Sequence, residues 1–138
     1  MNRKILGIDF GTSSIKIVRA GHGVVLDEKS VIAIYKKTEV LAVGDEAYEM
    51  YEKAPVNINV SYPVRNGVIA DLSNMNMMIS EFLAKVSEGK VRLKGYDYYI
   101  AVPTDITEVE KRSYFDVIIS TRLKPNHIRM VEKPIADA

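Results

Sequence analysis

The amino-acid sequence predicts an α/β fold in which helices lie on a β-sheet. Along the 138 residues, the hydrophobic pattern switches several times between the period of two that is typical of strands and the longer period of helices. This alternation favours a sheet covered by helices over a helical bundle or a β-sandwich. A hydrophobic fraction of 47% is enough for one buried core in a chain of this length.

The first part of the chain predicts an antiparallel meander of three strands. We expect the strands over residues 4–10, 14–20 and 23–28, which are apolar, strand-like runs. Short turns separate them at Gly11-Thr12 and at Gly21-His22-Gly23. Turns of this length join neighbouring antiparallel strands, so the three strands should lie side by side.

The middle of the chain predicts a smaller group of elements. Two strands are expected over 30–35 and 40–43, followed by a short helix over 45–53. The segment 54–64 contains two prolines and two asparagines, which are typical of an irregular crossing segment. We expect a subdomain boundary there.

Two longer helices are expected in the second half. Asp71 or Ser73 can cap the first of them. A strand follows over 96–102, and Thr107 and Glu110 form a capping box for the second helix. The apolar stripe of the first helix consists of Leu72, Met75, Met78, Ile79, Phe82, Leu83 and Val86.

The end of the chain predicts a strand and the start of another helix. The strand is expected over 127–131, and Glu132-Lys133-Pro134 follows it. Proline is common in the first turn of a helix. A helix needs several turns to bury an apolar face, so we expect this one to continue past Ala138.

Composition and charge exclude several classes of function. Lys plus Arg total 19 against 18 for Asp plus Glu, so no basic field favours nucleic acid as a partner. The sequence has no cysteine, which excludes a disulfide framework and a thiolate metal site, and His22 and His127 are its two imidazole candidates. No apolar run reaches the length of a membrane span or of a signal-peptide core, so we expect a cytoplasmic protein.

The most informative segment is the turn between the first two predicted strands. Small residues there let backbone N–H groups point at phosphate oxygens, and hydroxyl groups add donors. Asp9 would hold a hydrated magnesium ion, and Lys16 would neutralise a phosphate. The alternative is an ordinary hairpin whose polar side chains satisfy their own backbone. The turn residues expected to line the phosphates are Gly11, Thr12, Ser13 and Ser14.

Six segments occur in a fixed order along the chain, at residues 7–12, 23–34, 43–47, 63–71, 102–112 and 132–138. They include Gly-Ile-Asp-Phe-Gly-Thr at the first turn and Glu-Lys-Pro-Ile-Ala-Asp-Ala at the end. Together they resemble the N-terminal half of the MreB family of bacterial actin homologues over essentially the whole chain. The first segment alone is less specific, because actin, sugar kinases and chaperone ATPases share it.

The resemblance implies an actin-like ATPase fold with a mixed sheet. A ribonuclease-H-like subdomain would span residues 1–30 and 65–138, and a small inserted subdomain would span 31–64. In such proteins two similar halves clamp Mg-ATP, and the second phosphate loop and the adenosine site belong to the other half. We therefore expect the chain alone to bind Mg-ATP with millimolar or undetectable affinity.

The resemblance further implies filaments that lie on the inner membrane and organise cell-wall synthesis. ATP and magnesium would drive this self-association, with Asp9 acting on the metal through water. The alternative is a non-catalytic actin-like half that binds or caps filaments of a full-length relative. A metabolite kinase of the same superfamily fits less well, because segments 63–71 and 102–112 resemble MreB rather than sugar-binding segments.

Two positions depart from the family pattern. Lys16 stands where MreB proteins usually have an apolar residue, although it matches the phosphate lysine of actin. Lys133 stands where they usually have an acidic residue that orients the attacking water, and an ammonium group cannot accept a proton. Glu132 is adjacent but is expected on a different side of the turn. Hydrolysis is therefore not expected of the chain alone, unless Lys133 is simply a surface residue at a helix start.

Residues 87–95 stand where MreB-like proteins carry a membrane-contacting loop. Val91 and Leu93 alternate with three basic residues. The two aliphatic side chains would insert into lipid while each cation adds about 1 kcal/mol at an anionic surface. A solvated basic turn is the alternative.

Overall fold

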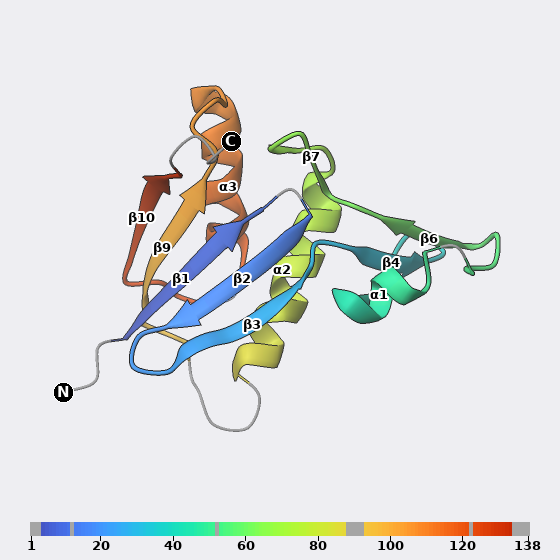
Figure 1. Ribbon diagram of the computed structural model, residues 1–138, viewed down its shortest axis with the longest axis horizontal. Helices are drawn as coiled ribbons and strands as arrows, with labels where there is room; N and C mark the ends of the chain where they lie inside the picture. Colours follow the sequence, from blue (N-terminus) through green and yellow to red (C-terminus); the bar gives the residue numbers. More distant parts are fainter. Residues whose placement is uncertain (1–3, 12, 52, 88–92, 122, 134–138) are drawn as a thin grey trace.

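The computed structural model describes residues 4–11, 13–51, 53–87, 93–121 and 123–133, which form two groups of elements. A five-stranded sheet has two helices on one face, and a three-stranded sheet with a short helix lies beside it (Figure 1). The helices are α1 (Asp45–Glu49), α2 (Leu72–Ser87) and α3 (Glu108–Ser120). The strands are β1 (Ile5–Phe10), β2 (Ser14–Arg19), β3 (Gly23–Lys29), β4 (Ile32–Tyr35), β5 (Glu39–Val43), β6 (Ile58–Ser61), β7 (Val64–Arg65), β8 (Val68–Ile69), β9 (Asp97–Val102) and β10 (His127–Glu132).

The large sheet is mixed, as expected, and has the strand order β10-β9-β1-β2-β3. The predicted meander is confirmed, because β2 pairs antiparallel with both β1 and β3. By contrast, β9 runs parallel to β1, and β10 runs parallel to β9. The carboxyl ends of β1, β9 and β10 therefore meet at one edge of the sheet.

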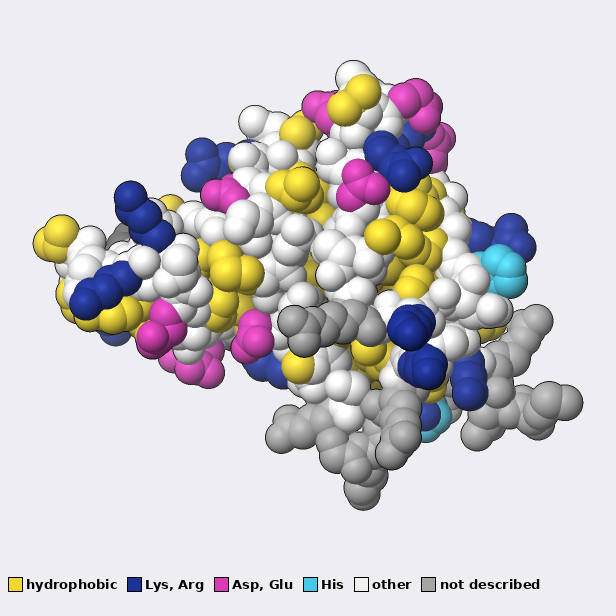
Figure 2. Space-filling view, turned by 180° about the vertical axis from the view of Figure 1, so that it is seen from behind, with side chains coloured by type: hydrophobic (Ala, Val, Ile, Leu, Met, Phe, Trp, Pro, Cys, Tyr) yellow, Lys and Arg dark blue, Asp and Glu magenta, His cyan; other side chains and the backbone are white. Residues whose placement is uncertain are grey.

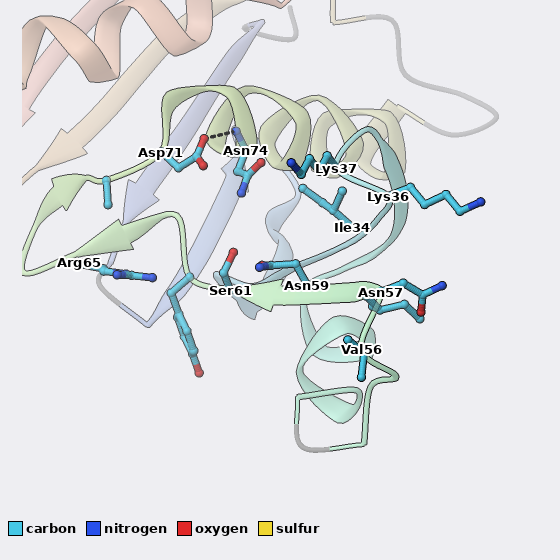
Figure 3. A pocket seen from close by; sticks show the side chains of 13 residues that line it. Ile34, Lys36, Lys37, Val56, Asn57, Asn59, Ser61, Arg65, Asp71 and Asn74 are labelled. Carbon is cyan, nitrogen blue, oxygen red and sulfur yellow. Dashed lines mark hydrogen bonds between the residues drawn. The ribbon is translucent and has the colours of Figure 1, made fainter.

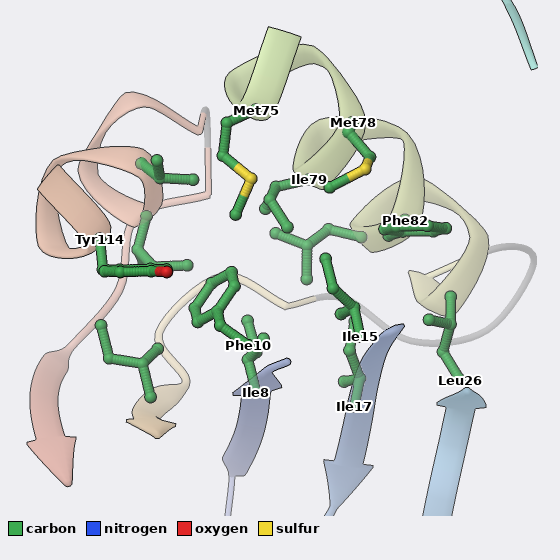
Figure 4. Close-up of a cluster of buried hydrophobic side chains, with 14 of the residues drawn as sticks. Ile8, Phe10, Ile15, Ile17, Leu26, Met75, Met78, Ile79, Phe82 and Tyr114 are labelled. Carbon is green, nitrogen blue, oxygen red and sulfur yellow. The ribbon is translucent and has the colours of Figure 1, made fainter. Parts of the chain in front are cut away.

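The main core lies between the large sheet and its two long helices. Ile8 and Phe10 of β1 are 1% exposed and face α2 and α3 (Figure 4). The Phe10 ring lies 5.0 Å from the Tyr114 ring of α3, measured between centroids. The predicted stripe of α2 is buried except at its ends, where Leu72 is 47% exposed. The periodicities in the sequence thus identify the facing surfaces of both layers.

The small sheet has the order β5-β4-β6, and its central strand is buried on both faces. Ile32 and Ile34 pack in the main core, whereas Val31 and Ala33 pack with Ala47 of α1 in a second cluster. Alternate residues over 31–34 thus pack into two different cores. The predicted subdomain ranges, 1–30 with 65–138 and 31–64, stay a prediction.

The expectation of irregular chain over 54–64 was wrong. β6 lies within this segment and pairs antiparallel with β4, opposite the side that β5 occupies. Asn57 and Asn59 disfavour a strand by intrinsic propensity, but pairing with a buried strand outweighs that preference. The helix predicted over 45–53 is also shorter, since α1 ends at Glu49.

A hairpin that the sequence analysis missed joins the two groups of elements. β7 and β8 pair around Asn66 and Gly67, whose φ angles are +54° and +78°. Two successive positive φ angles are typical of the tight hairpin turn that Asn-Gly favours. The buried Tyr114 hydroxyl donates a hydrogen bond of 2.7 Å to the Gly67 carbonyl oxygen, which ties this turn to α3.

Both long helices begin at predicted caps. The Asp71 carboxylate accepts a hydrogen bond of 2.9 Å from the Asn74 backbone N–H, and Thr107 and Glu110 form the expected capping box. Acidic side chains gather at the end of the molecule where α3 begins (Figure 2). The helix predicted after Glu132 lies outside the described residues. Within the part of the chain that the structure describes, no helix is long and apolar enough to cross a membrane.

Candidate functional site

The carboxyl edge of the large sheet is the candidate site. We use this name for the ends of β1, β9 and β10 together with the turn that joins β1 to β2. Ligands of open sheets with parallel strands bind beyond the carboxyl ends of those strands. Asp9 and the turn predicted for phosphate and metal binding lie at this edge, and Lys133, predicted at the water-orienting position, reaches it from the end of β10.

The turn at this edge requires glycine at position 11. The Gly11 N–H donates to the Ser14 carbonyl oxygen at 2.9 Å, which closes the turn. A Cβ atom at Gly11 would lie 2.7 Å from that same oxygen, closer than atoms can pack. The Ser13 carbonyl accepts from the Ser30 N–H at 3.0 Å, so the turn is also tied to the chain after β3. Ser13 and Ser14 are exposed, and Thr12 lies outside the described residues.

Lys133 bridges the two ends of the chain. Its Nζ atom lies 2.9 Å from Asp9 Oδ1 and donates to the Phe10 carbonyl oxygen at 2.7 Å. Its backbone N–H donates to the Val102 carbonyl at 2.8 Å, which fixes the start of the side chain beside β9. The Lys133 side chain is 29% exposed and that of Asp9 is 52% exposed, so solvent and ligands reach both groups.

Charged side chains lie beside the turn on one face of the sheet. Lys16 is exposed and stands directly opposite Asp9 in the β1–β2 register. Side chains alternate across a strand, and because Ile8 and Phe10 face the core, Asp9 belongs to the opposite face. Asp27 stands opposite Lys16 in the β2–β3 register, so two ammonium groups, Lys16 and Lys133, and two carboxylates, Asp9 and Asp27, lie on this face.

Glu132 is held away from this cluster by a different lysine. Lys111 of α3 forms an ion pair with Glu132 and a second one with Glu108, at 3.4 Å. The hydrogen bond to Glu132 raises the pKa of the Lys111 ammonium, and Glu108 adds to this effect. From the sequence, Glu132 and Lys133 are expected on different sides of the turn. In the structure Glu132 contacts Lys111, whereas Lys133 contacts Asp9.

The residues of the edge do not fit a magnesium site as they stand. A magnesium ion bound through water needs a carboxylate oxygen available to its hydration shell. Asp9 is the carboxylate at this position, and the Lys133 ammonium already contacts its Oδ1 atom. Among the described residues, no group of three or more His, Cys, Asp or Glu side chains is arranged to hold a metal. The role of Asp9 toward magnesium stays a prediction, and it would require the metal to share the carboxylate with the Lys133 ammonium or to displace it.

The predicted membrane loop receives no support from Leu93. This side chain is 1% exposed and belongs to the main core, so it is not available for insertion into lipid. Alternation with basic residues resembled an amphipathic loop, but Leu93 packs inward as the chain returns toward β9. Val91 lies outside the described residues.

A hollow that was not predicted lies elsewhere on the described surface. It measures about 690 Å³ and lies between the small sheet and the start of α2. Figure 3 shows Asn59, Ser61 and Arg65 on its strand side, and Asp71 with Asn74 on its helix side. The β6 strand forms part of the strand side of this hollow. Because irregular chain was expected over 54–64, the hollow could not be expected from the sequence.

Solved structures with a similar fold include nucleotide-bound proteins. The crystal structure of MreB5 of Spiroplasma citri bound to AMPPNP has a TM-score of 0.80 at 26% sequence identity, covering 96% of this chain and 39% of that one. The same protein bound to ADP has a TM-score of 0.78. The MamK double helical filament has a TM-score of 0.71 at 20% identity and covers 93% of this chain, which shows likeness of fold alone.

Curated relatives carry a consistent description. The chain is 36% identical over 130 residues to the cell shape-determining protein Mbl of Bacillus subtilis, covering 94% of this chain and 38% of the relative. It is 31% identical over 138 residues to the cell shape-determining protein MreB of Escherichia coli, covering 96% of this chain and 39% of the relative. The chain thus spans about two fifths of the length of these relatives. The sequence model of the MreB/Mbl protein family matches residues 3–138, and the chain belongs to that family.

Proposed function

We propose that the carboxyl edge is one side of a nucleotide phosphate site in an actin-like protein that determines cell shape. The single observation that carries this proposal is the Gly11 turn beside two ammonium groups. Its close backbone approach, its exposed hydroxyl groups and the neighbouring ammonium groups suit phosphate oxygens. The MreB5 structures with AMPPNP and ADP support ATP as the ligand class.

Binding without hydrolysis is the activity that this edge supports. A catalytic base must accept a proton from the attacking water. Of the two carboxylates described here, Asp9 contacts Lys133 and Glu132 contacts Lys111. The ammonium of Lys133 has no lone pair to offer, so it acts as a counter-charge. We therefore propose no ATPase activity for the chain alone.

Assembly is the second part of the proposal. The names of the curated relatives support a role in cell shape, and the MamK double helical filament, which has a similar fold, supports self-association of the complete protein into filaments. We propose that such filaments lie against the inner membrane from the cytoplasmic side and organise cell-wall synthesis. Since Leu93 is buried, this proposal assigns no lipid contact to that side chain.

The alternative function is a non-catalytic partner that binds or caps filaments of a full-length relative. The Lys133 contact with Asp9 favours it, because this contact occupies the group expected to serve magnesium. Co-sedimentation with filaments of a full-length relative separates the two proposals. A capping protein lowers the pelleted mass of the relative at substoichiometric amounts, whereas a co-assembling subunit increases the total pelleted mass.

Nucleotide binding is tested by titrating the ¹⁵N-labelled chain with ATP and following backbone amide shifts. We expect saturable shifts at Gly11, Ser13 and Ser14, with a millimolar dissociation constant, since one side of a site binds weakly. The variant Gly11→Ala should lose them, because its Cβ meets Ser14 O. The matched control is Gly7→Ala, whose Cβ would meet its nearest neighbours at 3.9 Å. Absence of shifts at the turn in the unaltered chain would contradict the proposal.

A further inference from the structure

We propose that the Lys133 ammonium takes the place of a divalent metal at the carboxyl edge, so that this chain binds nucleoside polyphosphates without magnesium. This inference rests on the proposed phosphate site and names its counter-ion. It follows from a side chain that reaches from the end of β10 past β9 to the end of β1. The ligand class is a polyphosphate free of metal.

The contacts of Lys133 leave one donor for a ligand. An ammonium group has three N–H donors. One points to Asp9 Oδ1 at 2.9 Å and a second to the Phe10 carbonyl oxygen at 2.7 Å. The side chain is 29% exposed, so the third donor is accessible from solvent. The Phe10 carbonyl immediately precedes Gly11, so this donor lies next to the turn whose hydroxyl and N–H groups suit phosphate.

The same contacts oppose a metal. A divalent ion bridged to Asp9 would have to displace or approach the Lys133 ammonium, and like charges a few ångströms apart repel. The Phe10 carbonyl oxygen also accepts from Lys133, which holds the ammonium group at this position. The lysine thus supplies a fixed positive charge where a metal would otherwise be recruited together with the nucleotide.

The decisive experiment compares ATP titrations of the ¹⁵N-labelled chain in EDTA and in excess magnesium. We expect binding in EDTA to be at least as tight as in magnesium. In the Lys133→Met variant, the stem is kept and the charge is lost. Its affinity in EDTA should fall about tenfold, as expected for loss of a charge-assisted hydrogen bond. Magnesium should restore much of that loss, since Asp9 is then released.

Two further variants separate the role of Lys133 from a general effect of charge. Lys124→Met removes the same charge from an exposed position outside the edge and should leave both affinities unchanged. Asp9→Asn removes a carboxylate beside the phosphates and should tighten binding in EDTA by about threefold, through relief of repulsion. At a site that depends on magnesium, Asp9→Asn would instead weaken binding in the titration with excess magnesium, and that result would overturn the inference.

Metal alone provides a readout that needs no nucleotide. Manganese broadens amide signals near its binding site. We expect no selective broadening at Asp9 and Phe10 in the unaltered chain, and selective broadening there once Lys133→Met frees the carboxylate. Broadening centred on Asp9 in the unaltered chain would contradict the inference.

The possible outcomes distinguish this inference from the proposed function. Binding at the Gly11 turn that requires magnesium retains the phosphate site and rejects the role of Lys133. Absence of binding at the turn in both EDTA and magnesium rejects the phosphate site and the inference together. Amide spectra of each variant without ligand show whether it is folded, so a collapsed variant is recognised and Asp9→Asn then decides the case.

Discussion

The carboxyl edge and the hollow beside β6 both present polar groups, yet they differ in what those groups are already bound to. In the hollow, the Asp71 carboxylate is committed to the start of α2, and Asn59, Ser61 and Arg65 line an open space of about 690 Å³. At the edge, a short turn and the reaching Lys133 concentrate donors in a small region. The two regions thus differ in organisation, because an ammonium group is held beside a closed glycine turn at the edge, whereas a helix cap faces an open space in the hollow.

The largest effect is expected at the turn of the edge. Gly11→Ala should destabilise the fold by about 2 kcal/mol, because the new methyl group overlaps Ser14 O and the backbone must shift. Urea denaturation measures this change against the control Gly7→Ala. If Gly11→Ala were as stable as Gly7→Ala and still bound ATP, the backbone at the Gly11 turn would not require glycine. The proposed difference between the carboxyl edge and the hollow would then be contradicted.

Tyr114 links the two regions, and its removal is expected to come next in size. Its ring packs on Phe10 at the edge, while its hydroxyl holds the Gly67 carbonyl beside the hollow. Tyr114→Phe keeps the ring and leaves that buried carbonyl unpaired, at a cost of about 1–2 kcal/mol. Thermal or urea unfolding provides the measurement. An unchanged stability would mean that the β7–β8 turn is not anchored through this bond.

Alkaline pH should weaken the same link. Burial raises the pKa of Tyr114 to about 12 and also raises that of Tyr98, from an ordinary value of 10.0. These groups favour folding fully below pH 10, and their contribution is lost as the pH rises from about 10 toward 12. Urea midpoints measured across this range should fall, and the fall should be smaller in Tyr114→Phe. Midpoints that rise with pH in this range would contradict the assignment.

The smallest of these effects is expected at the hollow. Asp71→Ala should cost about 1 kcal/mol through loss of the α2 cap, whereas Asp71→Asn keeps an acceptor and should cost less. Neither variant should change the ATP-induced shifts at the Gly11 turn, since Asp71 has a structural role. If Asp71→Asn kept its stability but lost ATP binding, ATP would be shown to bind in the hollow rather than at the Gly11 turn.

The parts of the fold that local patterns determine could be predicted from the sequence. The alternation of apolar and polar residues predicted the β1–β2–β3 meander, and the apolar stripe of α2 predicted its buried face. Thr107 and Glu110, three positions apart, predicted the capping box of α3. β6 was missed because Asn59 disfavours a strand and the pairing of β6 with β4 is a long-range contact. The β7–β8 hairpin had an Asn-Gly signal that was overlooked.

The candidate site was predicted in its residue types but not in its contacts. Asp9, Gly11, Ser13 and Ser14 could be identified because small polar residues at a turn are informative within a short window. That Lys133 reaches Asp9 depends on the parallel pairing of β1, β9 and β10, which brings residues 124 positions apart into contact. Leu93 shows the converse, since its local pattern suggested exposure and its long-range packing buries it.

The most direct test of the central claim is a crystal structure of the chain with AMPPNP, grown in EDTA at ligand concentrations above the dissociation constant. We expect the triphosphate to lie against the Gly11 turn, with a phosphate oxygen within hydrogen-bonding distance of Lys133 Nζ and no metal on Asp9. A triphosphate seated in the hollow between β6 and α2, or one that binds at the edge only when magnesium on Asp9 has displaced Lys133, would contradict this claim.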